Sequence, residues 1–194
     1  KNEIKFEEEL DLSNQNTIDK LKEADKYIKI DKVGTIEVDT TAIPSLSKKA
    51  KLTMHKLVGY VAPPGILVDG KADTNNVVGK VTLNKETGSA SFSVAHFTTF
   101  TAVPEIVLLS PTTTTLSSTK DLVFKARVSD AKAKVTGSFN GKELANLKPD
   151  EKTGEFTLTK LEVKEGKNEL KLQATSELGK VTPLVAGISY NPNG

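Results

Sequence analysis

Apolar and polar residues alternate along the second half of the chain with a period of two, which is typical of half-buried β-strands. LVFKARV at residues 122–128 has this pattern, and so does EGKNELKLQAT at residues 165–175. Asn140-Gly141 separates two short strand patterns and favours a two-residue hairpin turn. Turn signals between the strands then predict an immunoglobulin-like sandwich of about six short strands.

The first half of the chain has shorter apolar runs. Strands are predicted at YIKI, TIEVD, AKLTMHKL, GILV and GKVTL. The spacing of Ile18, Leu21 and Ala24 predicts one short helix over about residues 17–25, capped by Asn16 or Thr17. The first half is therefore expected to be a second β-sandwich with a helix in a crossover.

A long final strand, ASFSVAHFTTFTAV at residues 90–103, is predicted to close the first module. Its even positions include Phe92 and Val94, so the even face is expected to be the core face. His96 and Thr98 share that phase. Phe97 points the other way and interrupts the polar run, so the sheet is expected to bend or to switch sides there.

Pro104 and the Thr/Ser run after it mark a change of module between Val103 and Ile106. The predicted domains are residues 1–104, a β-sandwich module with a short helix, and residues 105–194, an immunoglobulin-like domain. The predicted fold class is mainly β, with two tandem β-sandwich domains.

Charge and composition narrow the functional classes. The 194 residues carry a formal net charge of +2, and positive and negative residues are mixed along the chain. A basic patch with aromatic residues between the charges, which would indicate nucleic-acid binding, is missing from the sequence, so nucleic-acid binding is not expected. No apolar run reaches the length of a membrane span, so no membrane insertion is expected. The absence of cysteine excludes zinc-thiolate sites, disulfides and cysteine nucleophiles. The charged first residues, KNEIKFEEEL, suggest a mature or excised part of a longer protein.

The second module carries a recognisable motif series. GSFNGKEL, followed by GEFTLTKLEVKEGKNELKLQATSELGKV, resembles the bacterial immunoglobulin-like repeats of extracellular enzymes and surface proteins. The resemblance covers about residues 108–190. It implies a module that mostly acts as a spacer or connector.

The first module also resembles a known type. IEVDTTAIPSLSKKAKLTMHKL, PPGILVDG and the ending GSASFSVAHFTTFTAV resemble a module of prokaryotic cell-surface proteins that ends on a Phe-x-Val-x-His-Phe-Thr-x-Phe strand. The resemblance covers about residues 35–103. It implies a place in a multidomain surface protein, commonly before immunoglobulin-like repeats, and no enzymatic activity.

His96-Phe97-Thr98 resembles the motif of self-cleaving proteins, namely adhesion-receptor autoproteolysis domains and a nucleoporin. The resemblance implies Thr98 as nucleophile, His96 as base and cleavage of the Phe97–Thr98 bond by an N–O acyl shift. The cysteines that flank the receptor site are absent, and the following residues continue as a plain strand pattern. The alternative is a buried structural histidine with a hydrogen-bond partner.

A second candidate site lies in DGKADTNN, where Asp69, Asp73 and Asn75 could bind calcium. The spacing does not match an EF-hand loop, and the same residues are ordinary turn formers. A Lys–Asn or Lys–Asp isopeptide cross-link is left open, since both residue types are abundant. The chain has no Gly-x-Ser-x-Gly, His-Glu-x-x-His or P-loop motif, and the two histidines argue against a His-rich metal site.

These observations predict a non-catalytic structural, spacer or adhesion-scaffold segment of a bacterial or archaeal protein that is secreted or held at the cell surface. No cofactor is expected. The expected partners are other domains of the same surface protein, with a host or matrix protein or a glycan as further partners. The alternatives are a self-processing domain and a glycan- or protein-binding module, although the chain has no Trp and three Tyr residues for stacking on sugars.

Overall fold

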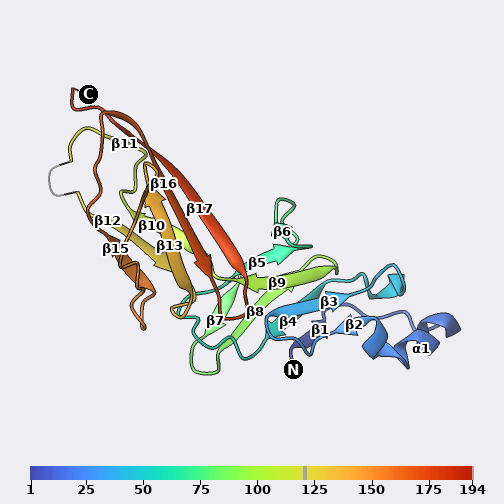
Figure 1. The fold of residues 1–194 in the computed structure, drawn as a ribbon. Coiled ribbons are helices and arrows are strands. Elements are labelled where there is room, and N and C mark those ends of the chain that lie inside the picture. The colour runs from blue at the N-terminus through green and yellow to red at the C-terminus, as the bar shows by residue number, and fades with distance from the viewer. Residues whose placement is uncertain (120–121, 194) are drawn as a thin grey trace. The chain divides into compact units, whose positions relative to one another are not determined.

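A computed structural model describes residues 1–119 and 122–193 (Figure 1). The fold is mainly β, with one α-helix among the described residues and several antiparallel sheets, which confirms the predicted β-sandwich class. The chain divides into two compact units. The first unit contains Lys1–Val58 and Pro63–Val103, and the second contains Gly59–Ala62 and the chain from Pro104 onward.

The first unit contains two sheets, and every pairing in them is antiparallel. One sheet has the order β1 (Glu3–Phe6), β4 (Ala50–Met54), β8 (Ser89–Val94), β7 (Thr82–Asn84). The other has the order β2 (Ile28–Lys29), β3 (Thr35–Val38), β9 (Thr99–Val103), β5 (Gly65–Val68), β6 (Lys71–Ala72).

Alternation places the core of the first unit between its two sheets. Leu52 and Met54 of β4 are fully buried, as their spacing predicts. Phe92 of β8 and Phe100 of β9 belong to different sheets, and their ring centroids lie 6.1 Å apart in an edge-on arrangement. This aromatic pair joins the apolar faces of the two sheets, and such a pair contributes about 0.5–1.5 kcal/mol beyond the area it buries.

The helix lies earlier in the chain than the spacing predicts. Helix α1 is Gln15–Leu21, and a separate 3₁₀ turn, η1, covers Ala24–Lys26. The cap is Asn14, whose side-chain oxygen accepts the Asn16 N–H at 2.9 Å, so the prediction of Asn16 or Thr17 as cap was wrong. An Asn with extended backbone satisfies one of the unpaired N–H groups of the first turn, and this fixes where the helix begins. A second 3₁₀ turn, η2, is Pro44–Leu46.

The predicted long final strand is two strands. β8 ends at Val94, residues 95–98 form a bend, and β9 begins at Thr99 in the other sheet. The chain therefore switches sheets here, as the position of Phe97 predicts. The placement of His96 on the core face was wrong: His96 is exposed, whereas Phe97 is buried. The bend resets the alternation, so Phe97 takes the inward position and contacts Phe6 at 5.4 Å between ring centroids.

The second unit also contains two sheets. The three-stranded sheet has the order β10 (Ile106–Ser110), β12 (Phe124–Val128), β15 (Glu155–Leu158). The five-stranded sheet has the order β11 (Thr115–Leu116), β17 (Val181–Tyr190), β16 (Gly166–Thr175), β13 (Lys134–Phe139), β14 (Lys142–Glu143). β11 and β17 run parallel, and the other pairs are antiparallel.

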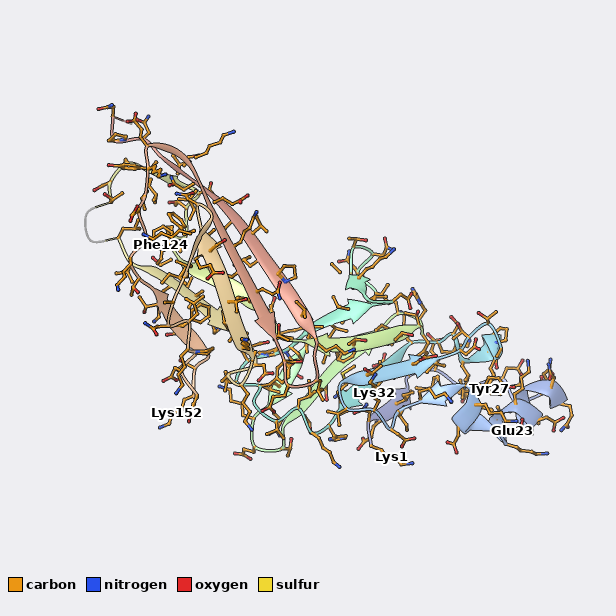
Figure 2. All side chains as sticks on the ribbon, viewed as in Figure 1. Lys1, Glu23, Tyr27, Lys32, Phe124 and Lys152 are labelled. Atoms are coloured by element: carbon orange, nitrogen blue, oxygen red, sulfur yellow. The ribbon has the colours of Figure 1, made fainter. Side chains whose placement is uncertain are left out.

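The core of the second unit follows from the alternation in its strands. Phe124 of β12, labelled in Figure 2, meets Phe139 of β13 from the other sheet at 5.6 Å between ring centroids. Leu170 in β16 is fully buried. Asn140 and Gly141 have φ angles of 48° and 80°, so the predicted hairpin turn between β13 and β14 is confirmed.

The first strand of the second unit begins at one end of the unit, and its last strand finishes at the opposite end. β10 begins at Ile106, which pairs with Val128, at the end we call the Ile106 end. β17 finishes at Tyr190, which pairs with Gly166 of β16 and with Leu116 of β11. This second end, the Tyr190 end, is the one toward which β10 and β11 run (Figure 1).

The segment Gly59–Ala62 belongs to the second unit although it lies within the sequence of the first. The Val61 N–H donates to the Ser129 carbonyl at 2.8 Å, and the Ala131 N–H donates to the Gly59 carbonyl at 2.9 Å. Tyr60 is buried and forms an isolated bridge with Asp130. These contacts lie at the Ile106 end.

Candidate functional site

The bend between β8 and β9 holds the His96-Phe97-Thr98 motif. The Thr98 hydroxyl donates a short hydrogen bond to the Asp69 carboxylate, and the Thr99 N–H donates to the same oxygen at 3.2 Å. The hydroxyl that the self-cleavage hypothesis assigns as nucleophile is thus held by Asp69. His96 is exposed at the same bend.

Asp69 occupies this position because of the turn that it forms. Asp69 and Gly70 have φ angles of 51° and 74°, and they connect β5 to β6. Asp and Gly tolerate these left-handed conformations better than other residues. The Asp69 N–H donates to the Thr99 carbonyl at 2.9 Å, so Asp69 fastens this turn to the start of β9 through its backbone and its side chain.

Asp73 organises the loop after β6. Its carboxylate accepts the backbone N–H groups of Val78 at 2.8 Å and of Val77 and Asn75 at 3.1 Å each. These bonds, the one from Val78 above all, lower the pKa of Asp73, and the nearby charge of His96 acts in the same direction. The structure thus brings residues of both predicted sites into one region, with Thr98 bound to Asp69 and His96 near Asp73.

The predicted calcium ligands are engaged within the protein. Asp69 binds Thr98 and Thr99, and Asp73 holds its own loop. Asn75 contributes its backbone N–H to Asp73. Among residues 1–119 and 122–193, no three His, Asp or Glu side chains come together in a group that could hold a metal ion. Calcium binding stays a prediction, and it would have to displace these hydrogen bonds.

A further cluster joins three residues that the sequence patterns did not connect. His55, which directly follows β4, has its Nδ1 atom 2.8 Å from the Ser89 hydroxyl and its Nε2 atom 2.9 Å from a carboxylate oxygen of Glu3. Ser89 is buried, whereas the His55 side chain is 32% exposed and that of Glu3 is 71% exposed. The three residues come from or beside β1, β4 and β8, so no local motif could reveal them; the alignment of these strands brings them together.

Backbone hydrogen bonds fix the position of His55. Its N–H donates at 3.0 Å to the side chain of Asn2, which is buried and also donates to the carbonyls of Lys32 and Thr35. Two residues later, the Leu57 N–H donates at 2.9 Å to the carbonyl of Gly88, the residue before Ser89. The imidazole and the hydroxyl are therefore attached to backbone segments that are bonded to each other.

The cluster opens onto a pocket of about 360 Å³ on the outer face of the β1-β4-β8-β7 sheet. The pocket is lined by His55, Thr82, Asn84, Thr87, Ser89 and Ser91. Its lining side chains are polar: Thr82, Asn84, Ser89 and Ser91 occupy strand positions that point away from the core, and His55 and Thr87 lie directly after β4 and in the turn before β8. Ser91 is paired with Thr53 through their hydroxyl groups at 3.0 Å.

A second pocket, of about 230 Å³, lies in the second unit between β14 and the segment before β16. Its rim includes Lys142 and Glu162, which form an ion pair at 2.9 Å. Both side chains are well exposed, so this ion pair contributes little to stability.

No helix in the described part of the chain is long and apolar enough to cross a membrane. In comparisons with known proteins, no protein-family model, no curated protein and no solved structure matches the chain.

Proposed function

We propose that the chain is a structural segment, acting as a spacer or adhesion scaffold, of a multidomain bacterial or archaeal protein that is secreted or held at the cell surface. The observation that carries the proposal is the placement of the first and last strands of the second unit. β10 begins at the Ile106 end and β17 finishes at the Tyr190 end. A unit connected in this way can stand in series with other domains and extend a chain.

The strand order of the second unit supports an immunoglobulin-like type. A three-stranded sheet, β10-β12-β15, faces a five-stranded sheet, β11-β17-β16-β13-β14. The chain leaves the first sheet after β10 and joins the second as β11, parallel to the last strand. Immunoglobulin-like sandwiches likewise have two sheets of mainly antiparallel strands, and inward-facing residues from both sheets form the core.

Connection in series also determines how the unit would carry a load. A pull on the two ends would draw β10 and β11 toward the Ile106 end and β17 toward the Tyr190 end. β11 and β17 would then slide along each other, and the Ser189 N–H bond to Thr114 and the Asn191 N–H bond to Leu116 would be loaded together. Bonds loaded side by side resist more force than bonds that open one after another.

The partners in this proposal are the other domains of the same surface protein. A host or matrix protein, or a glycan, could also bind the exposed loops of either unit. The pocket beside Lys142 and Glu162 offers polar groups to such a ligand.

Single-molecule pulling of the whole chain from its two termini tests the proposal. The expected record contains a force peak for the second unit with a length gain of roughly 300 Å, from about 3.3–3.6 Å per extended residue. Ser189→Pro is expected to lower this peak, because it removes the N–H that donates to Thr114.

Val185→Pro is the matched control. Residues 185 and 189 have the same parity in β17, so both N–H groups point away from β16, but among the described residues β11 pairs only with Ser189 and Tyr190. The control should therefore keep the wild-type force. Equal forces for Ser189→Pro and wild type, or the absence of a separate peak for the second unit, would argue against a load-bearing role.

The self-processing alternative makes a different prediction. Cleavage at Phe97–Thr98 would divide the chain, whereas a scaffold stays as a single species of 20.9 kDa. The Thr98 hydroxyl donates its single proton to Asp69 and not to His96, the base that the self-cleavage hypothesis assigns, so we expect the intact mass under denaturing conditions. Two fragments, one ending at Phe97 and one beginning at Thr98, would replace the scaffold proposal with self-processing.

A further inference from the structure

The hydrogen bonds of the Glu3–His55–Ser89 cluster determine which of its groups donate. A carboxylate can only accept, so the His55 Nε2 atom, 2.9 Å from Glu3, must carry the proton. In a neutral imidazole the Nδ1 atom is then the acceptor. The Ser89 hydroxyl, 2.8 Å away, donates to it. The imidazole is thus oriented as a base toward the serine.

This arrangement is that of an activated nucleophile. A serine becomes nucleophilic when a base lies within hydrogen-bond reach and a third group orients that base. Here the distances to both neighbours of His55 are within that reach. The Asn2 and Leu57 hydrogen bonds hold the backbone on both sides of His55, so the ring is positioned before any substrate arrives.

The pocket beside Ser89 provides room for a small substrate and a donor for a developing negative charge. The Asn84 side-chain oxygen accepts the N–H groups of Glu86 and Thr87 at 3.0 and 3.2 Å. These bonds engage the oxygen of the Asn84 amide, and Asn84 is one of the residues that line the pocket, so its Nδ2 group is the amide donor assigned to a substrate there. Amide donors of this type stabilise the oxyanion of acyl-transfer reactions.

We propose that Ser89 is an acyl-accepting nucleophile for small carboxylic esters, with His55 as general base and Glu3 as the residue that positions His55. The Ser89 oxygen attacks the ester carbonyl carbon, and the Ser89 proton moves to the His55 Nδ1 atom. The carbon–oxygen bond to the leaving group breaks, and His55 returns the proton to that alkoxide, which departs as an alcohol. Water then hydrolyses the serine ester by the same transfers and releases the carboxylic acid.

This activity goes beyond the scaffold role and does not depend on it. The proposed load path lies in β10, β11 and β17 of the second unit, whereas the Glu3–His55–Ser89 cluster lies in the first. Loss of one property therefore leaves the other unchanged. A surface segment with this cluster would become acylated by esters that reach it.

Covalent labelling of the whole chain tests the proposal. The chain is incubated with a fluorophosphonate, whose phosphorus is attacked by activated serines with release of fluoride, and the adduct is located by peptide mass spectrometry. In parallel, p-nitrophenyl acetate measures acyl transfer through release of p-nitrophenol. We expect the adduct on Ser89 and an initial burst of p-nitrophenol.

Variants separate the three roles. Ser89→Ala should abolish the adduct, and His55→Gln should slow labelling about 100-fold or more, as expected for loss of a general base. Glu3→Gln should slow it less, because the ring keeps its backbone anchor. Ser93→Ala is the matched control: Ser93 is exposed on the same strand, outside the pocket, and this variant should label as fast as wild type.

Circular dichroism spectra of each variant show whether it folds. If His55→Gln fails to fold, the Glu3→Gln rate decides instead, since Glu3 is largely exposed. The proposal is wrong if no adduct forms on Ser89, or if the folded His55 and Glu3 variants label at the wild-type rate.

Discussion

A single buried amide joins several backbone segments at the Tyr190 end of the second unit. The Asn168 side-chain oxygen accepts the Asn140 Nδ2 group and the Lys164 N–H, both at 2.9 Å. Its nitrogen donates to the carbonyls of Lys164, Gly166 and Ile188. Asn168 is almost completely buried, so water cannot replace these partners when the side chain is removed.

Asn168→Ala should therefore lower the free energy of unfolding by about 1–3 kcal/mol, the usual cost of unsatisfied buried groups. Asn168→Asp should cost more at neutral pH, because it places a carboxylate against three carbonyl oxygens. That excess should shrink as the pH falls, since protonation restores a donor. Urea unfolding measures both effects.

The control for the Asn168 variants is Asn191→Asp. Asn191 is exposed, and its side-chain oxygen accepts the Asn193 N–H, which an aspartate also can accept. A change within about 0.5 kcal/mol is expected there. If Asn168→Asp behaved like this control, the amide network would not be a source of stability.

Single positions could be predicted from the sequence where a strand continues without interruption. Leu170 and Leu172 are buried as the alternation predicts. His96 and Phe97 exchange their expected environments, because alternation holds only until the strand bends. Partners distant in sequence, such as Asp69 for Thr98 or Ser89 for His55, depend on strand pairing and leave no local pattern.

Two turns contain glycines with similar φ angles but different surroundings, so comparing them distinguishes the cost of backbone strain from the cost of a steric clash. Gly154, before β15, has a φ angle of 72°, and Gly179, before β17, has one of 75°. A Cβ atom at Gly154 would lie 2.1 Å from the Val128 carbonyl oxygen, whereas one at Gly179 would meet no atom within 4 Å. The first turn is packed against β12, and the second is open to solvent.

Gly179→Ala should cost about 1–2 kcal/mol, which is the penalty for a side chain in the left-handed region. Gly154→Ala should cost a further 1–3 kcal/mol or so, because the backbone must move to make room for the methyl group. Thermal unfolding of the two variants measures the difference. If both variants lost the same stability, the backbone around Gly154 and Val128 would be able to move apart at no energetic cost.

Elements could be predicted where their signals are strong. Asn140-Gly141 determines a hairpin because both residues adopt positive φ angles readily. The helix was misplaced because the three-residue spacing of Ile18 and Leu21 continues to Ala24, while the hydrogen bond that decides its start comes from Asn14. The alternation indicates a switch of sheets at Phe97, but it does not show that β8 already ends at Val94, three residues earlier.

At the scale of the whole molecule, each unit has a core of its own. Phe100 is fully buried in the first unit, and Leu170 is fully buried in the second. The sequence places the change of module near Pro104, and that two-domain organisation stays a prediction until unfolding is measured. The assignment of Gly59–Ala62 to the second unit could not be predicted, since it depends on partners about 70 residues further along the chain, such as Ser129.

Calorimetry of the whole chain should show two unfolding transitions. Phe100→Ala should weaken one of them by about 3–5 kcal/mol, and Leu170→Ala should weaken the other by about 2–5 kcal/mol, because each removes a large side chain from a filled core. A single transition that both variants lower together would contradict the proposal of two domains.

The position of Gly59–Ala62 has a consequence for how the gene can be divided. A fragment that starts at Pro104 would lack the N–H of Val61 that binds Ser129, and it would expose the surface that Tyr60 covers beside Asp130. A fragment that stops at Val103 would carry the same four residues without their partners. Recombination that exchanged either half as a continuous block would separate them, so the two halves are expected to be inherited together.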